Sequence, residues 1–409
     1  MKKVLGIVLL VLALSLVSVP AFAQQVELNL KLWHPGVVGA DEWVADYGTY
    51  DFEAIELRGV SVLQWEPPPH KDENELVLRP GSGLSFILSG EYFILPSISV
   101  GGSYWGLSRA DEVGVELENN YMSFPYSATT TLNGEPKWYW IKLPWFEEEV
   151  PVWGQEAVLG GKETLSMSAL DVHVTKAFSG SGWEADLSGG VRRAAFNEHL
   201  STELDLIAEY EYEADEESYR EWWGRKDHYD LGSKVSMSAI GPQVGIKGIY
   251  ALADKLVLKA GAKAGLLFGT AQTDATFTRK FWGYDYTEEI PNNAGFHVAP
   301  AQAEEIPYEW ELLFSDEAPP HKATDTIRIT TFDLSAALAY QITEQLSVEA
   351  GYYASIWKGV PSLFQFSVDE YMGPAIAEDN GDSDPSLWEQ PEARDVIVGG
   401  LTLGVNFKF

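Results

Sequence analysis

The chain has 409 residues, no cysteine and a formal net charge of −33, although 45% of its residues are hydrophobic and 13% are aromatic. Its apolar content argues against disorder, and the missing cysteines exclude disulfides, thiolate zinc sites and cysteine nucleophiles. The strong negative charge argues against nucleic acid as a partner and favours cations.

The N-terminal stretch MKKVLGIVLLVLALSLVSVPAFA has the organisation of a secretory signal peptide. Two lysines precede an apolar run over residues 4–19, and the small residues of A-F-A at 21–23 suit cleavage. The alternative is a single transmembrane anchor, for which the run is short. We therefore predict a signal peptide over 1–23, Sec-type secretion through the periplasm, and one mature domain over 24–409.

Apolar and polar residues alternate in many segments of the mature chain, which is the period of a β-strand with two different faces. No long segment has a comparable helical period, so the sequence predicts an all-β protein. The clearest alternation lies at 84–94, 256–268, 332–340, 346–356 and 401–409.

Short and long connections between these strands follow one another in turn. The short ones lie at 95–97, 179–182, 253–255 and 343–345. The long ones are acidic and rich in proline, and run over roughly 34–82, 109–164, 197–228, 272–326 and 359–394. This order predicts a transmembrane up-and-down antiparallel β-barrel of about ten strands, with short periplasmic turns, long acidic extracellular loops and both ends of the barrel on the tight-turn side.

The count of ten strands depends on two assumptions. Residues 183–197 must cross the wall once, with 200–214 extending beyond the membrane. Residues 229–252 must form one strand, although the apolar positions change phase at Gly241 and Pro242, which predicts a β-bulge there. If either assumption fails, twelve strands are expected.

A soluble sandwich or a lipocalin-like barrel would also carry one apolar face. The long loops at one end and the absence of cysteine favour the membrane barrel, which places the protein in the cell outer membrane, among its lipid and lipopolysaccharide. Aromatic residues near the strand ends are placed as an interfacial girdle would be: Tyr92, Phe93, Tyr104, Trp105, Tyr352 and Trp357.

The C-terminal sequence GGLTLGVNFKF predicts the strand that closes the barrel against the first one. Its apolar residues would face lipid, and Thr402, Asn406 and Lys408 would face the lumen. A terminal aromatic on an alternating strand is also similar to the assembly signal that outer-membrane barrels present to their insertion machinery. We assign this role to Phe407 and Phe409.

The polar face of the predicted strands carries charges of both signs. They can either cross-link the walls and fill a narrow bore, or line a constriction that sorts ions by sign. The sequence leaves both interpretations open. The candidate lumen-lining residues are Glu91, Asp171, His173, Asp186, Arg192, Lys247, Lys259, Lys263, Asp333 and Glu349.

Six stretches of the mature chain stand out together: LKLWHP, GGSYWGLS, GGVRRA, IGPQVGIKGIYAL, SIWKGVP and GGLTLGVNFKF. They resemble the Legionella-type pore-forming major outer membrane protein family. They lie in predicted strands and leave most of each loop unmatched, and GPQVGIKGIYAL followed by GLLFG is the most specific. At Gly265 and Phe268 the family pattern leads us to expect Ser and Tyr. The resemblance implies an outer-membrane barrel that forms a pore, and it implies no catalytic residues.

We therefore predict a porin-like pore for passive passage of ions or small solutes, with no cofactor. The alternative is a non-conducting surface or adhesin-like barrel that uses its aromatic acidic loops, such as KWYWIKLPWF at 137–146.

The acidic stretch AEDNGDSDP at 377–385 offers oxygen ligands for Ca²⁺ without EF-hand spacing. Asp171, His173 and Thr175 alternate on one strand, but such neighbours are more often a packed polar row than a catalytic triad, so we expect no enzyme.

Overall fold

The computed structural model describes residues 25–39, 42–50, 56–57, 60–61, 70–78, 83–118, 138–142, 150–151, 156–213, 219–289, 311–366, 388–389 and 393–409. The predicted signal peptide and the acidic stretch 377–385 lie outside these residues. Within them, no helix is long and apolar enough to cross a membrane.

Ten strands form one closed antiparallel barrel in the order β1-β18-β15-β14-β13-β12-β11-β10-β7-β6, and β6 then pairs with β1. This confirms the prediction of ten strands rather than twelve. Residues 183–213 form one strand, and so do residues 219–253, as the count required. The strands are β1 (Gln25–Val38), β6 (Ser85–Leu95), β7 (Ile98–Glu118), β10 (Glu156–Gly180), β11 (Trp183–Glu213), β12 (Tyr219–Ala253), β13 (Leu256–Glu289), β14 (Glu311–Gln341), β15 (Leu346–Val360) and β18 (Arg394–Lys408).

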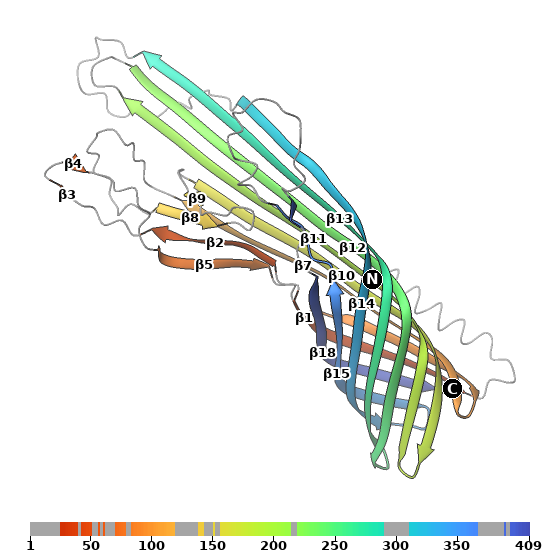
Figure 1. Cartoon of the computed structure of the whole chain (residues 1–409). Helices are drawn as coiled ribbons and strands as arrows, with labels where there is room; N and C mark the ends of the chain where they lie inside the picture. Colours follow the sequence, from red (N-terminus) through yellow and green to blue (C-terminus); the bar gives the residue numbers. More distant parts are fainter. Residues whose placement is uncertain are drawn as a thin grey trace.

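The four tight turns lie where the sequence predicted them, between β6 and β7, β10 and β11, β12 and β13, and β14 and β15. Figure 1 shows these turns and the C-terminus at the same end of the barrel. The barrel seam closes there as well, because the amide of Val26 donates to the carbonyl of Phe409 (3.1 Å) and the amide of Phe409 donates to the carbonyl of Val26 (2.9 Å).

The strands differ greatly in length, so one wall of the barrel is much taller than the other (Figure 1). Strands β11 to β14 have 31 to 35 residues, whereas β1, β6, β15 and β18 have 11 to 15. Much of the predicted loops 109–164, 197–228 and 272–326 is therefore strand, which corrects their predicted length. Loop-like composition misled the prediction because these strand extensions carry polar side chains on their outer face.

Small sheets accompany the barrel. Strands β2 (Glu42–Tyr50), β5 (His70–Leu78), β8 (Trp138–Lys142) and β9 (Val150–Pro151) form a sheet in the order β5-β2-β8-β9. Two-residue ladders join β3 (Glu56–Leu57) to β4 (Val60–Ser61) and β16 (Gln365–Phe366) to β17 (Trp388–Glu389).

Side chains alternate between the inside and the outside of the barrel along every long strand, but their chemistry reverses part of the way up. Near the turns, outward residues such as Val244 and Leu334 are apolar and exposed, while inward residues are polar. Higher up, inward residues such as Phe196 and Val235 are apolar and buried, and the outward ones are polar, as at Asn197 and Lys234. On β13 the change falls at Phe268. We call the part on the turn side of this level the lower barrel and the part beyond it the upper barrel.

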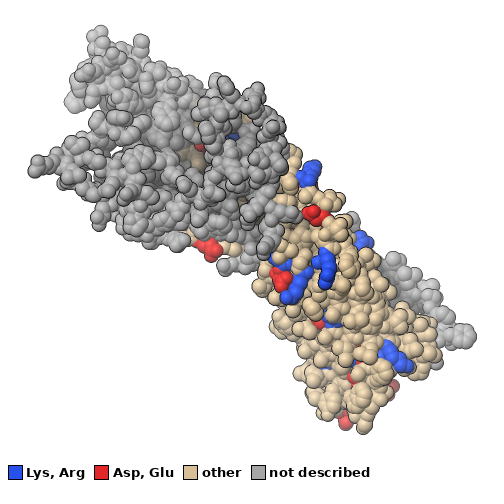
Figure 2. Space-filling view, viewed as in Figure 1, with Lys and Arg blue, Asp and Glu red and all other residues tan. Residues whose placement is uncertain are grey.

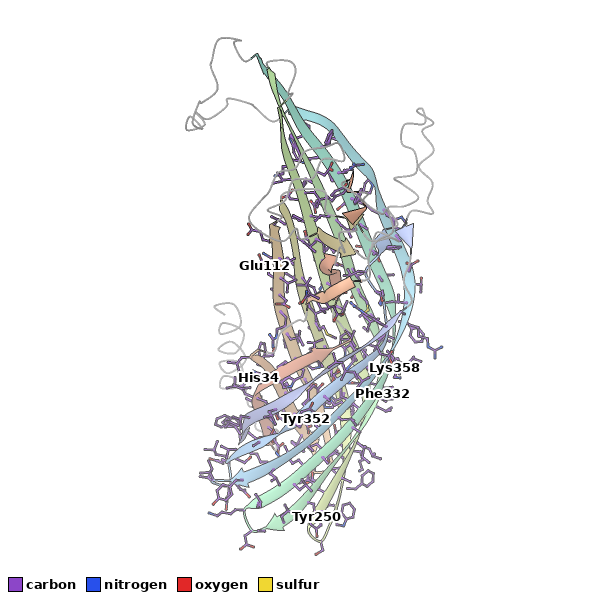
Figure 3. All side chains as sticks on the ribbon, turned by 90° about the vertical axis from the view of Figure 1, so that its left-hand side faces the viewer. His34, Glu112, Tyr250, Phe332, Tyr352 and Lys358 are labelled. Atoms are coloured by element: carbon purple, nitrogen blue, oxygen red, sulfur yellow. The ribbon has the colours of Figure 1, made fainter. Side chains whose placement is uncertain are left out.

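The outward apolar residues of the lower barrel form a belt of bilayer thickness. On β13 the belt runs from Leu258 to Phe268. These ten residue steps extend about 33 Å at ~3.3 Å per residue. A tilt of about 40° reduces this to about 25 Å, the height of the apolar band on barrels that span lipid. Figure 3 shows Tyr250, Phe332 and Tyr352 on this part of the barrel.

The β-bulge predicted at Gly241 and Pro242 is wrong. Ile240 pairs with Phe268 and Gln243 pairs with Gly265, so the register against β13 is the same on both sides of the dipeptide. The apolar positions change phase because the strand leaves the belt and its inward face becomes the apolar one. A register shift occurs instead at the turn, between Ala251 and Ala253.

The predicted aromatic girdle is correct only in part. Tyr92, Tyr104 and Tyr352 are exposed on the outer face. Trp105 and Trp357 are 2% and 0% exposed and belong to the interior, and Phe93 lines an interior cavity. The last three residues have the opposite parity from the belt residues of their strands, and the prediction weighed their distance from the strand ends more than their parity.

Candidate functional site

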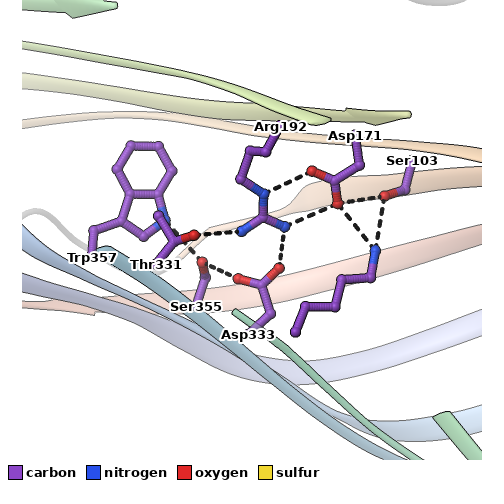
Figure 4. A network of polar contacts seen from close by, with 8 residues as sticks. Ser103, Asp171, Arg192, Thr331, Asp333, Ser355 and Trp357 are labelled. Carbon is purple, nitrogen blue, oxygen red and sulfur yellow. Dashed lines mark hydrogen bonds and ion pairs between the residues drawn. The ribbon is translucent and has the colours of Figure 1, made fainter. Parts of the chain in front are cut away.

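The interior of the lower barrel contains a buried charged cluster centred on Arg192 of β11 (Figure 4). Its Nε and Nη2 donate to the two carboxylate oxygens of Asp171 on β10 at 2.7 and 2.9 Å. On the other side of the bore, Nη2 donates to the Asp333 carboxylate and Nη1 donates to the Thr331 hydroxyl (3.2 Å) on β14. The guanidinium therefore ties two separate parts of the wall together.

Lys263 of β13 adds a second cation to this cluster. Its Nζ lies 3.0 Å from Asp171 Oδ2 and 3.4 Å from the hydroxyl of Ser103 on β7. The register explains the grouping, since Asp171 pairs directly with Arg192 and Lys263 pairs directly with Asp333. Two cross-strand pairs of opposite charge thus face one another across the bore. We call Asp171, Arg192, Lys263, Thr331 and Asp333 the Arg192 cluster.

A second ionic group lies nearer the turns, around Glu349 of β15. Its carboxylate accepts from Lys259 Nζ at 3.0 Å and from Asn29 Nδ2 at 3.4 Å, and it forms an ion pair with Lys31 of β1. The sequence prediction missed Lys31 and Asn29. Their signal was present, because they occupy the polar positions of the alternating stretch after the signal peptide.

The remaining predicted lumen residues lie around the same space. Lys247 is 3.5 Å from Asp186, and Glu91 accepts from the Ser99 hydroxyl at 3.1 Å and lies 4.0 Å from His173 Nε2. Nine of the ten predicted residues line a cavity of about 210 Å³, and the tenth is Arg192, which is buried and bound to the lining residues Asp171 and Asp333. A further cavity of about 170 Å³ lies at the turn end, lined by Glu27, Glu184 and other residues of the tight turns and strand ends.

An aromatic cluster adjoins the Arg192 cluster inside the barrel. The ring centroid of Trp33 on β1 lies 5.5 Å from that of Trp105 on β7 and 5.1 Å from that of Tyr353 on β15. The ring centroids of Trp105 and Trp357, on β15, are 5.8 Å apart. The two clusters are joined because the Trp357 indole donates to Ser355 Oγ (2.9 Å), which donates to Asp333 (2.6 Å). Trp33 and Trp357 are fully buried, so their rings pack inside the barrel.

The segment that follows β15 turns into the upper barrel. Leu363 and Phe364 are 4% and 5% exposed, and the amide of Phe364 donates to the hydroxyl of Ser233 on β12 at 3.1 Å. Strands β15 and β12 are not neighbours in the barrel. Residues 361–364 therefore connect β15 to a wall that is not its neighbour, and they bury Leu363 and Phe364.

The polar row Asp171, His173 and Thr175 does face the interior as a unit of alternating residues on β10. Its acid, however, is bound by Arg192 and Lys263, and no contact in the described part of the chain joins it to the imidazole as a triad would require. Within the described residues, no group of acids and histidines could hold a metal ion.

The two terminal aromatics lie at the outer rim of the turn end. Phe407 and Phe409 are 42% and 60% exposed, and their rings stack with centroids 6.3 Å apart. They are accessible from outside the barrel, where an assembly factor would meet them. Their role as an assembly signal stays a prediction.

No protein-family model and no curated protein matches this chain. Among solved structures, it is similar to the outer membrane protease OmpT from Escherichia coli, with 10% identity over 96% of this chain and 99% of that chain and a TM-score of 0.42. It is also similar to the Pseudomonas putida toluene transporter TodX, with 9% identity over 94% and 90% of the two chains and a TM-score of 0.20, and to a Pseudomonas aeruginosa FadL homologue, with 10% identity over 94% and 90% and a TM-score of 0.21. Similarity at this level carries no argument about activity.

Proposed function

We propose that the protein is an outer-membrane β-barrel with a closed bore, and that it works on the cell-surface side as a surface-structural or adhesin-like barrel. The observation that carries this proposal is the position of Arg192. Its side chain is 1% exposed, and it binds carboxylates from two separate walls of the lower barrel. A guanidinium held in this way occupies the path that a solute would take.

The outer-membrane location is supported by the apolar belt and by the closure of the sheet. Lipid offers no hydrogen bonds, so only structures that pair their own backbone groups can span it. The ten-stranded ring satisfies this condition at every strand edge of the lower barrel, including the seam between β1 and β18. The predicted secretory signal provides the route to the periplasm, and the exposed Phe407 and Phe409 fit a contact with the insertion machinery.

Closure of the bore is supported by three successive layers. The Arg192 cluster, the aromatic cluster and residues 361–364 each connect strands that are not neighbours in the barrel. Opening the first layer would separate buried ions from their partners, which costs several kcal/mol per ion. The interior of the upper barrel adds buried apolar residues such as Phe196, Leu204 and Val235, together with the buried Glu198, which is paired with Arg394.

The second candidate is the passive pore predicted from the sequence. The observation that favours it is the ionic lining of the two interior cavities, of about 210 and 170 Å³. These cavities would serve as a periplasmic vestibule, and ions or small solutes would pass once the Arg192 and aromatic clusters separate. We propose no catalytic activity. In the polar row Asp171, His173 and Thr175, the carboxylate of Asp171 is bound by Arg192 and Lys263.

Conductance of the purified full chain in planar lipid bilayers separates the two candidates. The closed-bore proposal expects no stepwise current from the wild type. It expects current from the triple variant Arg192→Ala, Trp105→Ala and Phe364→Ala, which removes a side chain from each of the three layers. Arg193→Ala with Trp105→Ala and Phe364→Ala is the matched control, since Arg193 is exposed on the outer face of the same strand. Regular current steps from the wild type would overturn the closed bore and favour the pore.

The surface role has a separate test in the aromatic segment 137–146, whose residues 138–142 form β8. Deleting this segment should leave membrane insertion and conductance unchanged, because β8 belongs to the small sheet and not to the barrel. Adhesion of expressing cells to protein- or glycan-coated surfaces should decrease. Unchanged adhesion would remove this segment from the proposed function.

A further inference from the structure

Two arginines lie on the outer face of the barrel at the upper edge of the apolar belt. Arg193 follows the belt residue Val191 on β11, and Arg328 lies two outward positions above Phe332 on β14. Both side chains are exposed, and neither belongs to the interior clusters. Figure 2 shows most of the visible Lys and Arg side chains near mid-height, with some Asp and Glu among them, above a lower part that is mostly uncharged and carries a few charged side chains.

The strand register places both arginines in a single cross-strand row. Arg193 pairs with Ile240, Ile240 pairs with Phe268, and Phe268 pairs with Arg328. Three strand spacings of about 4.8 Å separate the arginines by about 14 Å. Ile240 and Phe268 lie between them, and they are 57% and 50% exposed. The surface therefore presents two cations with an apolar patch between and below them, and we call it the Arg193–Arg328 surface.

The two positive charges of the Arg193–Arg328 surface are opposite in sign to the net charge of the chain. The chain is strongly acidic, with 61 Asp and Glu residues against 28 Lys and Arg. In the part of the chain that the structure describes, neither arginine forms an ion pair with an acid. On β15, Lys358 also lies just above the belt, but it is paired with Asp395 at 3.2 Å, and Figure 3 shows its place on the barrel. An unpaired cation at a lipid boundary is a binding group for anionic headgroups.

We propose that the Arg193–Arg328 surface binds the phosphates of an outer-leaflet glycolipid of the lipopolysaccharide type, with its acyl chains lying on Ile240, Phe268 and the belt below them. This inference rests on the proposed outer-membrane location and names the lipid contact of that membrane surface. A guanidinium binds phosphate through paired, charge-assisted hydrogen bonds. Two phosphates on one headgroup, or one phosphate on each of two adjacent lipids, satisfy the two arginines.

Binding of lipid A to the purified full chain in detergent tests this proposal, with native mass spectrometry or fluorescence titration as the readout. The wild type should bind diphosphorylated lipid A more tightly than enzymatically dephosphorylated lipid A. The variant R193S/R328S should lose this preference, with a decrease in affinity of about tenfold for each arginine, as expected when a hydrogen bond to a charged group is removed. Inorganic phosphate alone should compete only weakly, because it gains nothing from the apolar patch.

The matched control is Lys322→Ser, which removes an exposed outward cation from the same strand as Arg328, six residues farther from the belt. It should keep the preference of the wild type. The proposal is overturned if the wild type binds both lipids equally, or if K322S weakens binding as much as R193S/R328S does. A wild-type chain that fractionates as soluble periplasmic protein would instead overturn the outer-membrane location. Heat-modifiable mobility and circular dichroism confirm that each variant is folded.

Discussion

The lower and upper barrels are built from the same strands with the same inside–outside alternation, yet their chemistry is opposite. On β13, the outward residues from Leu258 to Phe268 are apolar, and the inward ones include Lys259 and Lys263. Beyond Phe268, the outward residues are polar, and the buried inward ones include Ala271 and Phe277. The difference teaches that the surrounding solvent, and not the strand pairing, decides which face of a barrel must be apolar.

This reversal also changes what stabilises each part. The upper barrel buries apolar side chains away from water, as a soluble protein does. The lower barrel gains little by hiding apolar groups from lipid, and its interior is held by ion pairs and hydrogen bonds across the bore. A polar interior of this kind is stable only when each charge keeps its partner.

The largest expected effect comes from Arg192→Met, which breaks the ionic interior of the lower barrel. The variant should lose about 3–5 kcal/mol of unfolding free energy, because Asp171 and Asp333 stay buried without the guanidinium. Unfolding of the protein by guanidinium chloride, measured in phospholipid vesicles, gives this loss of unfolding free energy. The triple variant R192M/D171N/D333N removes the charges together and should recover most of it. A single variant as stable as the wild type would contradict a role for the cluster in closing the bore.

The next largest effect tests the belt. Leu334→Arg places a charge on the lipid-facing side of β14 and should cost about 2–4 kcal/mol if this position lies near the middle of the bilayer. Thr326→Arg makes the same change on the same face, eight residues higher, above the belt. It should cost little, because its side chain meets water. Equal losses in the two variants would mean that the belt edge is wrongly placed.

A smaller effect is expected at the seam. Deleting Phe409 removes the two backbone hydrogen bonds to Val26, worth about 0.5–1.5 kcal/mol each. It also removes the exposed ring that we assign to the assembly signal. Insertion, measured as the appearance of heat-modifiable barrel in cells, should slow more than the unfolding free energy of the assembled protein decreases. The reverse order would limit Phe409 to a structural role.

The smallest effect compares the two apolar faces directly. Ile329→Val removes one methylene from a fully buried inward residue of β14 and should cost about 0.5–1.5 kcal/mol. Ile246→Val makes the same change at a belt residue that is 53% exposed. Lipid chains fill the space there, so its unfolding free energy should barely change. A similar loss at both sites would argue that Ile246 contacts protein rather than lipid.

Much of this architecture could be predicted from the sequence, because alternation and turn composition are local properties. They correctly located the strands of the barrel and the four tight turns. The reversal between Val235 and Val244 could not be read in this way. Alternation separates a strand into two faces, but it does not say which of them meets lipid. The phase change caused by the change of solvent along β12 was therefore interpreted as a β-bulge.

The charged interior was predictable residue by residue but not as a network. Parity alone placed residues such as Arg192 and Asp333 on the polar face. Their contact depends on the register of four strands, which is a sum over several pairings that no single stretch of sequence contains. For the same reason, the sequence did not reveal that Trp33, Trp105 and Trp357 meet inside the bore, since they come from three strands far apart in the chain.

The pairing of β1 with β18 has a consequence for the order of folding. The neighbouring hairpins, such as β12 with β13, join residues close in sequence and can form early. The seam joins residues 27–38 to residues 397–408, so the ring cannot close until β18 has been synthesised. Until then β1 and β18 each present an unpaired edge, which makes the open sheet prone to aggregation. The rate at which β1 pairs with β18 therefore sets how long these two edges stay exposed.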